Sequence, residues 1–223
     1  MLPGARVDTV LDWLSLPVSE RPRLMTLYFE HVDSTGHWYG PGSPENLETI
    51  RKIDTQLGRL LDGIEALPHG ESVSVLIVSD HGQSPYSDGE PFIIEQWVDL
   101  DGVKTVGKGT FVYLYFDEAD ERRTAVIRDT VNENWDCGRA YLPGELPAAW
   151  NAGESRRYPD VFLQSDPGCA VVVDAKSADR LLRGDHGWGP EMPEMGGIFY
   201  AMGPRIPAGT HAGVAQTIDV YPM

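Results

Sequence analysis

A long amphipathic helix between two short apolar segments is the feature that most constrains how this chain can fold. Residues 24–29 and 73–78 are mostly apolar and β-prone, so each is predicted to form a buried strand. Between them, Ser43 and Pro44 have the residue types of an N-cap and a first helical position. Strand, helix and strand in this order predict a βαβ unit with parallel pairing, and therefore an α/β sandwich. The apolar stripe of the helix consists of Leu47, Ile50, Ile53, Leu57, Leu60, Leu61 and Ile64.

The rest of the chain is predicted to add to the same domain, because no linker or repeat of domain scale divides residues 1–223. Residues 135–168 are rich in Gly, Pro and Trp and are expected to be irregular, within an irregular insertion at about 101–168. The further elements expected are helices near 7–14 and 119–132 and strands at 111–116, 170–173 and 198–202.

Charge and hydropathy narrow the classes of partner. The chain has 34 acidic and 18 basic residues and a net charge of −16, which repels a polyphosphate backbone and excludes long nucleic acid as a natural partner. A small anionic substrate can still bind where bound cations reverse the local field. No apolar run reaches the roughly 20 residues of a membrane span, and the first residues show no secretory pattern.

The two cysteines, Cys137 and Cys169, are too far apart in sequence for a Cys-x-x-Cys motif. One disulfide and two buried thiols are both compatible with this spacing. The cysteines therefore leave the compartment undecided.

Two Asp/His pairs follow the two predicted strands of the βαβ unit. Asp33 and His37 come just after the first strand, and Asp80 and His81 come just after the second. If the strands are parallel, both pairs lie at the same edge of the sheet, where ligands bind in open α/β folds. Imidazole with carboxylate suits zinc, and carboxylate oxygens also accept manganese or iron. The joint placement favours a metal site over a cap and a surface histidine at the first pair and over a simple turn at the second.

A second Asp-His-Gly, at residues 185–187, repeats the tripeptide at 80–82 and strengthens the metal hypothesis through His186. Glycines also adjoin the first two pairs. Gly36 and Gly82 would allow the close backbone approach or positive φ that a crowded metal site often needs.

With these motifs, the chain resembles the nucleotide pyrophosphatase/phosphodiesterase family, a branch of the alkaline phosphatase superfamily. The matching stretches are residues 26–37 with Gly40-Pro41, then 78–82, 184–188, 195–203 and 219–222. The resemblance implies an alkaline-phosphatase-like sandwich with a mostly parallel central sheet flanked by helices, incomplete at the N-terminal side. It implies metal-dependent hydrolysis of phosphodiester or pyrophosphate bonds, with nucleotides as substrates.

The family uses two zinc ions. By resemblance, Asp33, His37 and His186 hold one ion, and Asp80 and His81 contribute to the other. Asp185 matches the motif without being a ligand and is expected to support the turn. The two ions would clamp the phosphoryl group while a hydroxyl nucleophile attacks it.

The chain also departs from the family pattern. The family has a further metal-binding Asp and a Thr or Ser nucleophile well upstream of the stretch that matches Asp33, and residues 1–32 match neither. Ser34 and Thr35 do not correspond to that nucleophile. We therefore expect a partial catalytic domain that is inactive by itself, with an exposed, aggregation-prone sheet.

Three alternatives stay open. The chain could be another alkaline phosphatase superfamily enzyme, such as a phosphomutase, sulfatase or phosphoethanolamine transferase. It could instead be a non-catalytic metal-binding remnant, or its histidines could be purely structural. The family suggests a periplasmic or secreted protein, and the sequence itself carries no address.

Overall fold

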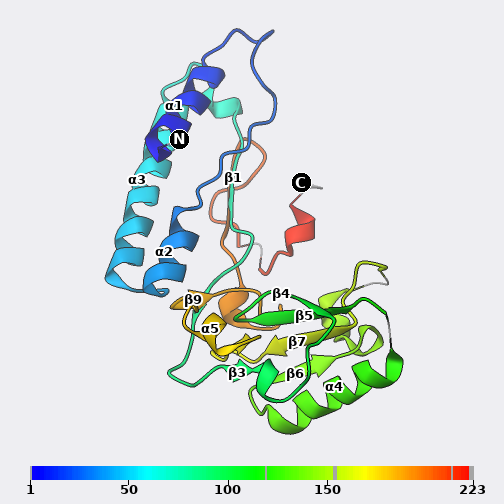
Figure 1. Cartoon of the computed structure of the whole chain (residues 1–223). Coiled ribbons are helices and arrows are strands. Elements are labelled where there is room, and N and C mark those ends of the chain that lie inside the picture. The colour runs from blue at the N-terminus through cyan, green and yellow to red at the C-terminus, as the bar shows by residue number, and fades with distance from the viewer. Residues whose placement is uncertain (1, 119, 153–154, 212, 221–223) are drawn as a thin grey trace. The chain divides into compact units, whose positions relative to one another are not determined.

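The structure is a computed structural model that describes residues 2–118, 120–152, 155–211 and 213–220 (Figure 1). It divides into two compact units. The first consists of residues 1–35, 42–80 and 197–223, and the second of residues 36–41 and 81–196. Each is described by itself.

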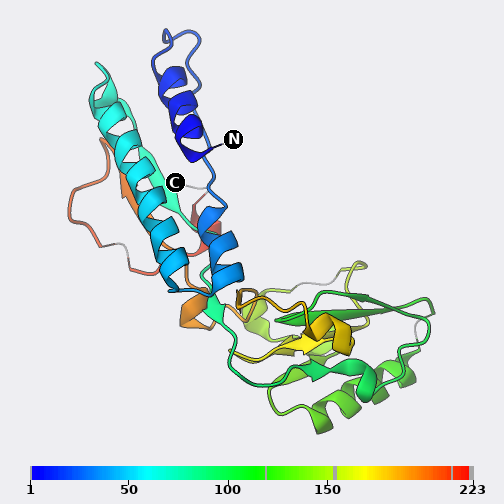
Figure 2. The same ribbon diagram turned by 60° about the vertical axis from the view of Figure 1, so that its left-hand side comes forward.

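Two helices, α1 (Pro3–Leu14) and α3 (Pro44–Glu65), form one layer of the first unit and lie side by side (Figures 1 and 2). As predicted, α3 begins after Ser43, whose hydroxyl accepts a hydrogen bond from the Asn46 amide at 3.2 Å. The two helices bury one face of each against the other, because apolar residues recur at helical spacing on both. Their shared core contains Val7, Val10, Leu14, Leu60 and Ile64.

The first unit also holds a two-stranded antiparallel sheet, which confirms two predicted strands. Strand β1 (Val75–Val78) pairs with β10 (Phe199–Met202) in the register Val75 to Met202. Val75 packs on the helix core, whereas Leu76 and Val78 are exposed. The unit is completed by the single turns η1 (Gly70–Ser72) and η6 (Thr217–Asp219).

The predicted strand at residues 24–29 is wrong, and with it the parallel βαβ unit. This segment pairs with no other described strand, although its burial alternates as in a strand. Met25, Leu27 and Phe29 pack on the helix core, whereas Leu24 and Tyr28 are exposed. The apolar run therefore corresponds to an extended segment that buries one face and does not pair with a described strand. Strand formation also needs a hydrogen-bonding neighbour, which an apolar run cannot specify.

The stretch from Glu30 to Gly42 is helical rather than the irregular segment that its polar, Gly-rich composition suggests. Helix α2 spans His31–Tyr39 and ends at Gly40, whose φ of 91° is a left-handed conformation. The hydroxyls of Ser34 and Thr35 donate back to the carbonyls of Glu30 and His31 at 3.0 Å each. These bonds satisfy both hydroxyls within the helix itself.

An ion pair ties α1 to the chain that enters α2. Arg6 Nη1 lies 2.5 Å from Glu30 Oε2, and Arg6 Nη2 donates to Glu30 Oε1 at 2.9 Å. The guanidinium, and then a hydrogen bond from its own backbone amide, lower the pKa of the Glu30 carboxyl to about 2 from an ordinary 4.5.

We expect Glu30→Gln to remove part of the acid sensitivity of the chain. A carboxyl whose pKa is lower when folded contributes stability above pH 4.5, and this contribution is lost as the pH falls towards 2. Melting temperatures measured from pH 6 to pH 2 should therefore fall less steeply for Glu30→Gln than for the unmodified chain. The control is Glu65→Gln at the exposed end of α3. Parallel pH profiles for all three proteins would contradict the prediction.

The second unit is built on a four-stranded antiparallel sheet in the order β4-β5-β7-β6. Helix α4 covers one face of this sheet (Figures 1 and 2). The buried residues between them include Val112, Leu114, Val131, Val161 and Leu163. The elements are β4 (Val103–Val106), β5 (Phe111–Phe116), α4 (Glu121–Asn134), β6 (Gly138–Tyr141) and β7 (Val161–Ser165).

Smaller elements complete the second unit. A parallel pair joins β3 (Phe92–Ile93) to β8 (Val171–Val172), and an antiparallel pair joins β2 (Ser84–Pro85) to β9 (Gly184–Asp185). Cys137 and Cys169 form a disulfide with a Cα–Cα distance of 6.1 Å, which decides between the two states that the sequence left open. The remaining elements are helix α5 (Ala175–Ala178) and the single turns η2 (Ile94–Gln96), η3 (Pro143–Glu145), η4 (Ala148–Trp150) and η5 (Pro193–Met195).

Several predicted boundaries can now be compared with these elements. The strand at 111–116 is confirmed as β5, the strand at 170–173 is shortened to β8, and the helix at 119–132 becomes α4, with residue 119 outside the described part. Residues 135–168 are more regular than expected, because they contain β6 and β7. Their Gly, Pro and Trp lie mainly in the turns between these strands, so composition hid the strands. Within the described ranges, no helix is both long and apolar enough to cross a membrane.

Candidate metal centre

Helix α2 places Asp33 and His37 four residues apart. At 3.6 residues per turn, this spacing puts both side chains on one face of the helix, one turn apart. The backbone hydrogen bond from the Gly40 amide to the Gly36 carbonyl, at 2.9 Å, continues the helix beyond His37. The helical geometry thus aims an oxygen ligand and a nitrogen ligand in the same direction.

His186 lies in a loop that the strands of the second unit hold in place. It follows β9 (Gly184–Asp185) directly. Its backbone amide donates a hydrogen bond to Oδ1 of the preceding residue, Asp185, at 3.0 Å. Thr110 Oγ1, next to β5, donates to the His186 carbonyl at 3.0 Å. Gln164 on β7 donates to the Gly187 carbonyl at 3.2 Å. Hydrogen bonds therefore hold the backbone at two successive residues, His186 and Gly187, which fixes the point from which the His186 side chain extends.

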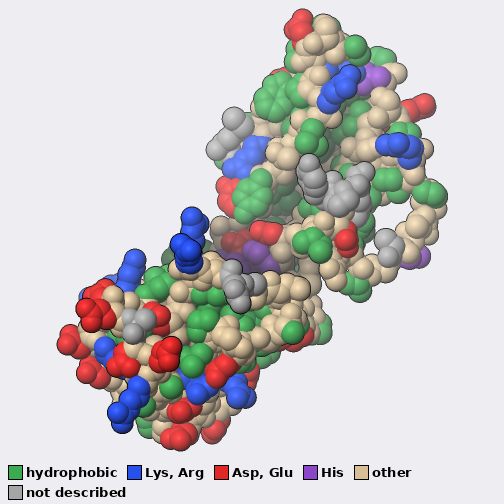
Figure 3. Space-filling model, turned by 90° about the vertical axis from the view of Figure 1, so that its right-hand side faces the viewer, with side chains coloured by type: hydrophobic (Ala, Val, Ile, Leu, Met, Phe, Trp, Pro, Cys, Tyr) green, Lys and Arg blue, Asp and Glu red, His purple; other side chains and the backbone are tan. Residues whose placement is uncertain are grey.

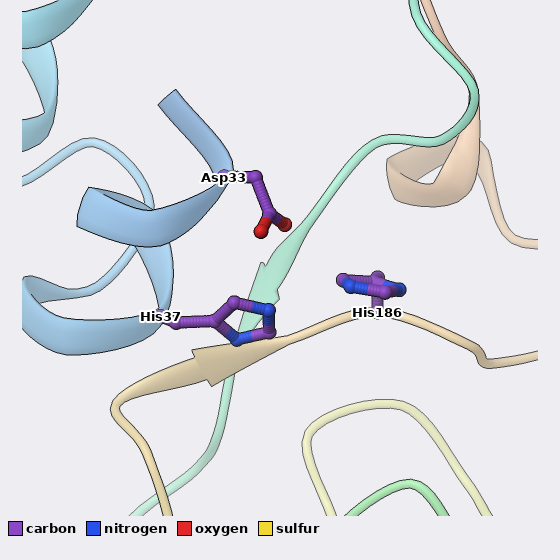
Figure 4. A group of neighbouring side chains, drawn as sticks. All are labelled: Asp33, His37 and His186. Atoms are coloured by element: carbon purple, nitrogen blue, oxygen red, sulfur yellow. The ribbon is translucent and has the colours of Figure 1, made fainter. Parts of the chain in front are cut away.

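Asp33, His37 and His186 form the one group of potential metal ligands that stands out among the described residues. One ligand atom from each of the three side chains lies within 4.8 Å of the others. All three side chains are half-buried, and Figure 4 shows them turned toward one another. Two imidazoles and a carboxylate are a donor set that zinc accepts, so the residues fit such an ion chemically.

The hydrogen bond of His37 fixes which ring nitrogen can bind a metal. His37 Nδ1 lies 2.8 Å from the Gly184 carbonyl oxygen, which can only accept, so Nδ1 carries the proton and the lone pair is on Nε2. The Arg183 amide in turn donates to the His37 carbonyl at 2.8 Å. A backbone acceptor behind the ring is a common arrangement for metal-binding histidines, because it sets the tautomer and the ring orientation.

Asp185, which the resemblance assigns to the support of the turn, also contacts His37 and Tyr86. Asp185 Oδ1 lies 3.7 Å from His37 Nδ1, and Tyr86 Oη donates to Asp185 Oδ2 at 2.6 Å. Burial, and then the hydrogen bond to Asp185, raise the pKa of Tyr86 well above its ordinary range, so this hydroxyl remains a donor at physiological pH.

The other predicted pair is placed differently. The His81 ring stacks on His186, with ring centroids 3.6 Å apart and an interplanar angle of 18°. Its Nδ1 lies 2.9 Å from the Gly82 carbonyl oxygen, so the lone pair is again on Nε2. Asp80, two residues after the end of β1, is exposed and is not among the three grouped ligands. His81 therefore adjoins the group, while the metal roles of Asp80 and His81 stay predictions.

Neighbouring atoms leave little space at the two glycines that the sequence singled out. A Cβ on Gly82 would overlap the backbone carbonyl oxygens of Glu194 and Gly196. A Cβ on Gly36 would instead overlap the end of the Gln83 side chain. Neither glycine has a positive φ, so space and not backbone conformation selects glycine at both positions.

We expect Gly82→Ala to lower the free energy of unfolding of the second unit by about 1–3 kcal/mol, because two carbonyl groups must move. Gly36→Ala is the matched control. It should cost less, because the flexible Gln83 amide can rotate away and alanine favours the helix. Urea unfolding followed by near-ultraviolet circular dichroism would measure both. Equal losses for the two variants would argue against the packing explanation.

Four residues around the site were not predicted from the sequence: Tyr86, Thr110, Gln164 and Gly184. Each acts through a hydrogen bond to the ligand loop or to a ligand side chain. Only the repeated Asp-His-Gly could have directed attention to Gly184, which immediately precedes it. The other three lie far away in sequence in segments without a recognisable motif.

Comparison with known proteins places these residues in a family. The profile of the family described as type I phosphodiesterase / nucleotide pyrophosphatase matches residues 2–189. The chain belongs to this family. It is 30% identical to bovine bis(5'-adenosyl)-triphosphatase ENPP4 over 230 residues, covering 98% of this chain and 47% of that protein. It is 28% identical to mouse ectonucleotide pyrophosphatase/phosphodiesterase family member 1, covering 97% of this chain and 24% of that protein.

A solved structure carries the same fold. Murine ectonucleotide pyrophosphatase/phosphodiesterase 5 matches with a TM-score of 0.82 at 24% identity, covering 92% of this chain and 53% of that one. The match confirms the expected alkaline-phosphatase-like α/β fold, of which this chain covers a part. The chain thus spans 24% and 47% of the length of the two curated relatives and 53% of the solved structure.

Proposed function

We propose that Asp33, His37 and His186 hold a zinc ion, and that this centre serves the hydrolysis of a phosphodiester or pyrophosphate bond. The observation that carries the proposal is the convergence of the three side chains, with the His37 tautomer set by the Gly184 carbonyl. Membership of the type I phosphodiesterase/nucleotide pyrophosphatase family supports the reaction class over a phosphomutase, sulfatase or phosphoethanolamine transferase.

The chain's own residues would hold and orient the ion. His37 and His186 present imidazole nitrogens from opposite backbone segments, and Asp33 adds a carboxylate that offsets part of the positive charge. When bound, zinc would supply positive charge to a phosphoryl oxygen. Thr110, Asp185 and Gln164 keep the His186 loop in place, so the ligand set changes little when a substrate arrives.

A second zinc site is proposed at Asp80 and His81. Two ligands are fewer than the three protein ligands of a typical catalytic zinc, so in the 223-residue chain this site would bind weakly. Manganese or iron could replace zinc in either site, because both include a carboxylate. We further propose that the chain by itself turns over little, because no residue of it matches the family's nucleophile.

The proposed substrate is a small anion, and specifically a nucleotide. Two relatives support this class by name, since one is a bis(5'-adenosyl)-triphosphatase and one solved structure is an inactive ENPP5 variant in complex with AMP. A net charge of −16 disfavours long nucleic acid, whereas a short substrate meets only the field of the metal centre. The Cys137–Cys169 disulfide supports an oxidising compartment such as the periplasm or the cell exterior.

Metal counting and a turnover assay on the same sample test the proposal. After dialysis against trace zinc, the chain should retain about one tightly bound zinc per molecule by inductively coupled plasma mass spectrometry. It should release nitrophenol from bis(4-nitrophenyl) phosphate no faster than free zinc does. Two tightly held ions, or steady turnover at rates typical of enzymes, would overturn the partial-site proposal. Retention of no metal would favour purely structural histidines.

A non-catalytic metal-stabilised domain is the second candidate function. The observation that favours it is that the ligand group in the described part of the chain comprises three side chains and does not include the predicted pair Asp80 and His81. Joining the chain to the matching remainder of a relative separates the two functions. Gain of phosphodiesterase activity that requires His37 would support the enzyme, whereas metal binding without activity would support the stabilising role.

A further inference from the structure

The sheet of the second unit has an aromatic face opposite α4. Three aromatic residues lie directly across from one another on neighbouring strands: Tyr113 on β5 pairs with Phe162 on β7, which pairs with Tyr141 on β6. The Tyr113 and Phe162 rings meet edge to face with centroids 5.2 Å apart, and Phe111 stacks on Tyr113 at 4.6 Å. The opposite face of the sheet packs against α4 and forms the core, so this row of rings takes no part in that packing.

A hollow of about 300 Å³ lies over this face. Tyr113, Phe162 and Gln164 line it from the sheet, while Trp150, Tyr158 and Trp188 line it from the connecting loops. Tyr158 meets Phe162 edge to face at 5.5 Å, and Trp150 meets Tyr141 in the same way at 5.6 Å. The volume is at the lower end of small-molecule sites, and every lining side chain is uncharged.

The second unit carries many charged side chains, whereas none of the described residues that line the hollow is charged. Figure 3 shows hydrophobic side chains lying among acidic and basic ones on one side of this unit. In a chain with a net charge of −16, an uncharged aromatic hollow selects against anions and for neutral ligands. Aromatic walls favour a planar ligand, because stacking on an aromatic side chain contributes about 1–3 kcal/mol per ring.

Gln164 gives the hollow one oriented polar group. Its Nε2 donates to the Thr110 carbonyl at 2.9 Å and to the Gly187 carbonyl at 3.2 Å. Two carbonyl acceptors fix the orientation of the amide, because the opposite orientation would set oxygen against oxygen. The amide oxygen, Oε1, is then the acceptor that remains, and no described residue donates to it. A ligand with an N–H group would satisfy it.

We propose that this hollow binds a neutral, planar heteroaromatic ring that stacks on its aromatic walls and donates a hydrogen bond from an amino group to Gln164 Oε1. An aliphatic ligand would gain no stacking and would leave the oxygen without a donor. None of the lining residues is among Asp33, His37, Asp80, His81 and His186, so no proposed metal ligand takes part in this site, although Gln164 also holds the His186 loop.

The first test compares two neutral ligands on the unmodified 223-residue chain. Adenosine carries an amino group on its ring, and purine riboside lacks it. In calorimetric titrations with EDTA present, adenosine should bind about 2–10-fold more tightly, the usual effect of one hydrogen bond. Inorganic phosphate at the same concentration should not compete. Equal affinities, no adenosine binding at millimolar concentrations, or loss of binding in EDTA would overturn the proposal without bearing on zinc binding.

Variants locate the binding. Trp150→Leu should weaken adenosine about tenfold, whereas Trp97→Leu, on a different surface of the same unit, should leave it unchanged. Gln164→Met should abolish the preference for adenosine over purine riboside. If Trp150→Leu fails to fold by circular dichroism, Gln164→Met and the ligand pair still decide. Equal weakening by the two tryptophan variants, or an unchanged preference in Gln164→Met, would contradict the assignment.

Discussion

His37→Ala is expected to lower the zinc affinity of the 223-residue chain by about a hundredfold or more. Loss of a group that only supports a metal ligand typically reduces affinity about 10–100-fold, and His37 is proposed as a ligand itself. The substitution removes one of three grouped donor atoms and leaves two, Asp33 and His186. Competitive titration against a chromophoric chelator at pH 7.5 would measure the change.

The control is His211→Ala, since His211 is exposed and lies outside the grouped ligands. This variant should keep the zinc affinity of the unmodified chain. Melting temperatures in EDTA should be similar for both variants, which would show that the loss concerns the metal and not folding. Equal zinc affinities for His37→Ala and His211→Ala would refute the proposed centre.

Removal of the disulfide with Cys137→Ser and Cys169→Ser should lower the free energy of unfolding of the second unit by about 3–4 kcal/mol. The bond closes a loop with a sequence separation of 32, and loop closure of this size restricts the unfolded chain by about that amount. Cys137 also packs against the sheet core, so a serine hydroxyl at this position should add to the loss. Urea unfolding of the second unit, followed by near-ultraviolet circular dichroism, gives the value.

Reduction provides the matched control for this prediction. Dithiothreitol should destabilise the unmodified chain to nearly the level of the double variant and should leave the double variant unchanged. The metal centre should keep its zinc affinity under both conditions, since neither cysteine is a proposed ligand. Superimposable unfolding curves for the oxidised chain and the double variant would contradict a stabilising role.

Local sequence patterns predicted single elements well and their partners poorly. Ser43, Pro44 and the apolar stripe located α3 because capping and helical periodicity are properties of consecutive residues. The apolar run at 24–29 was equally clear, yet its role depends on a neighbouring strand far away in sequence. The same limit applies to β1, whose partner β10 is antiparallel rather than a parallel strand before α3.

The residue types of the candidate site were predicted from the sequence, but the structural reason given for their proximity was wrong. Asp33 and His37 were expected at a sheet edge, whereas α2 places them one turn apart on a helix. Their spacing of four residues was visible in the sequence and would itself have indicated a shared helix face. The groups that orient the ligands, such as the Gly184 carbonyl and the Thr110 hydroxyl, become neighbours only after folding, so no local pattern marks them.

The pairing of β1 with β10 has a consequence for synthesis. Val78 pairs with Phe199, so about 120 residues leave the ribosome before β1 can find its partner. At roughly 5–20 residues per second, β1 waits about 6–24 s, and the four-stranded sheet of the second unit, whose last strand β7 ends at Ser165, is synthesised within that time. The four-stranded sheet can thus form before the pair of β1 and β10, and the N-terminal helices acquire their sheet last.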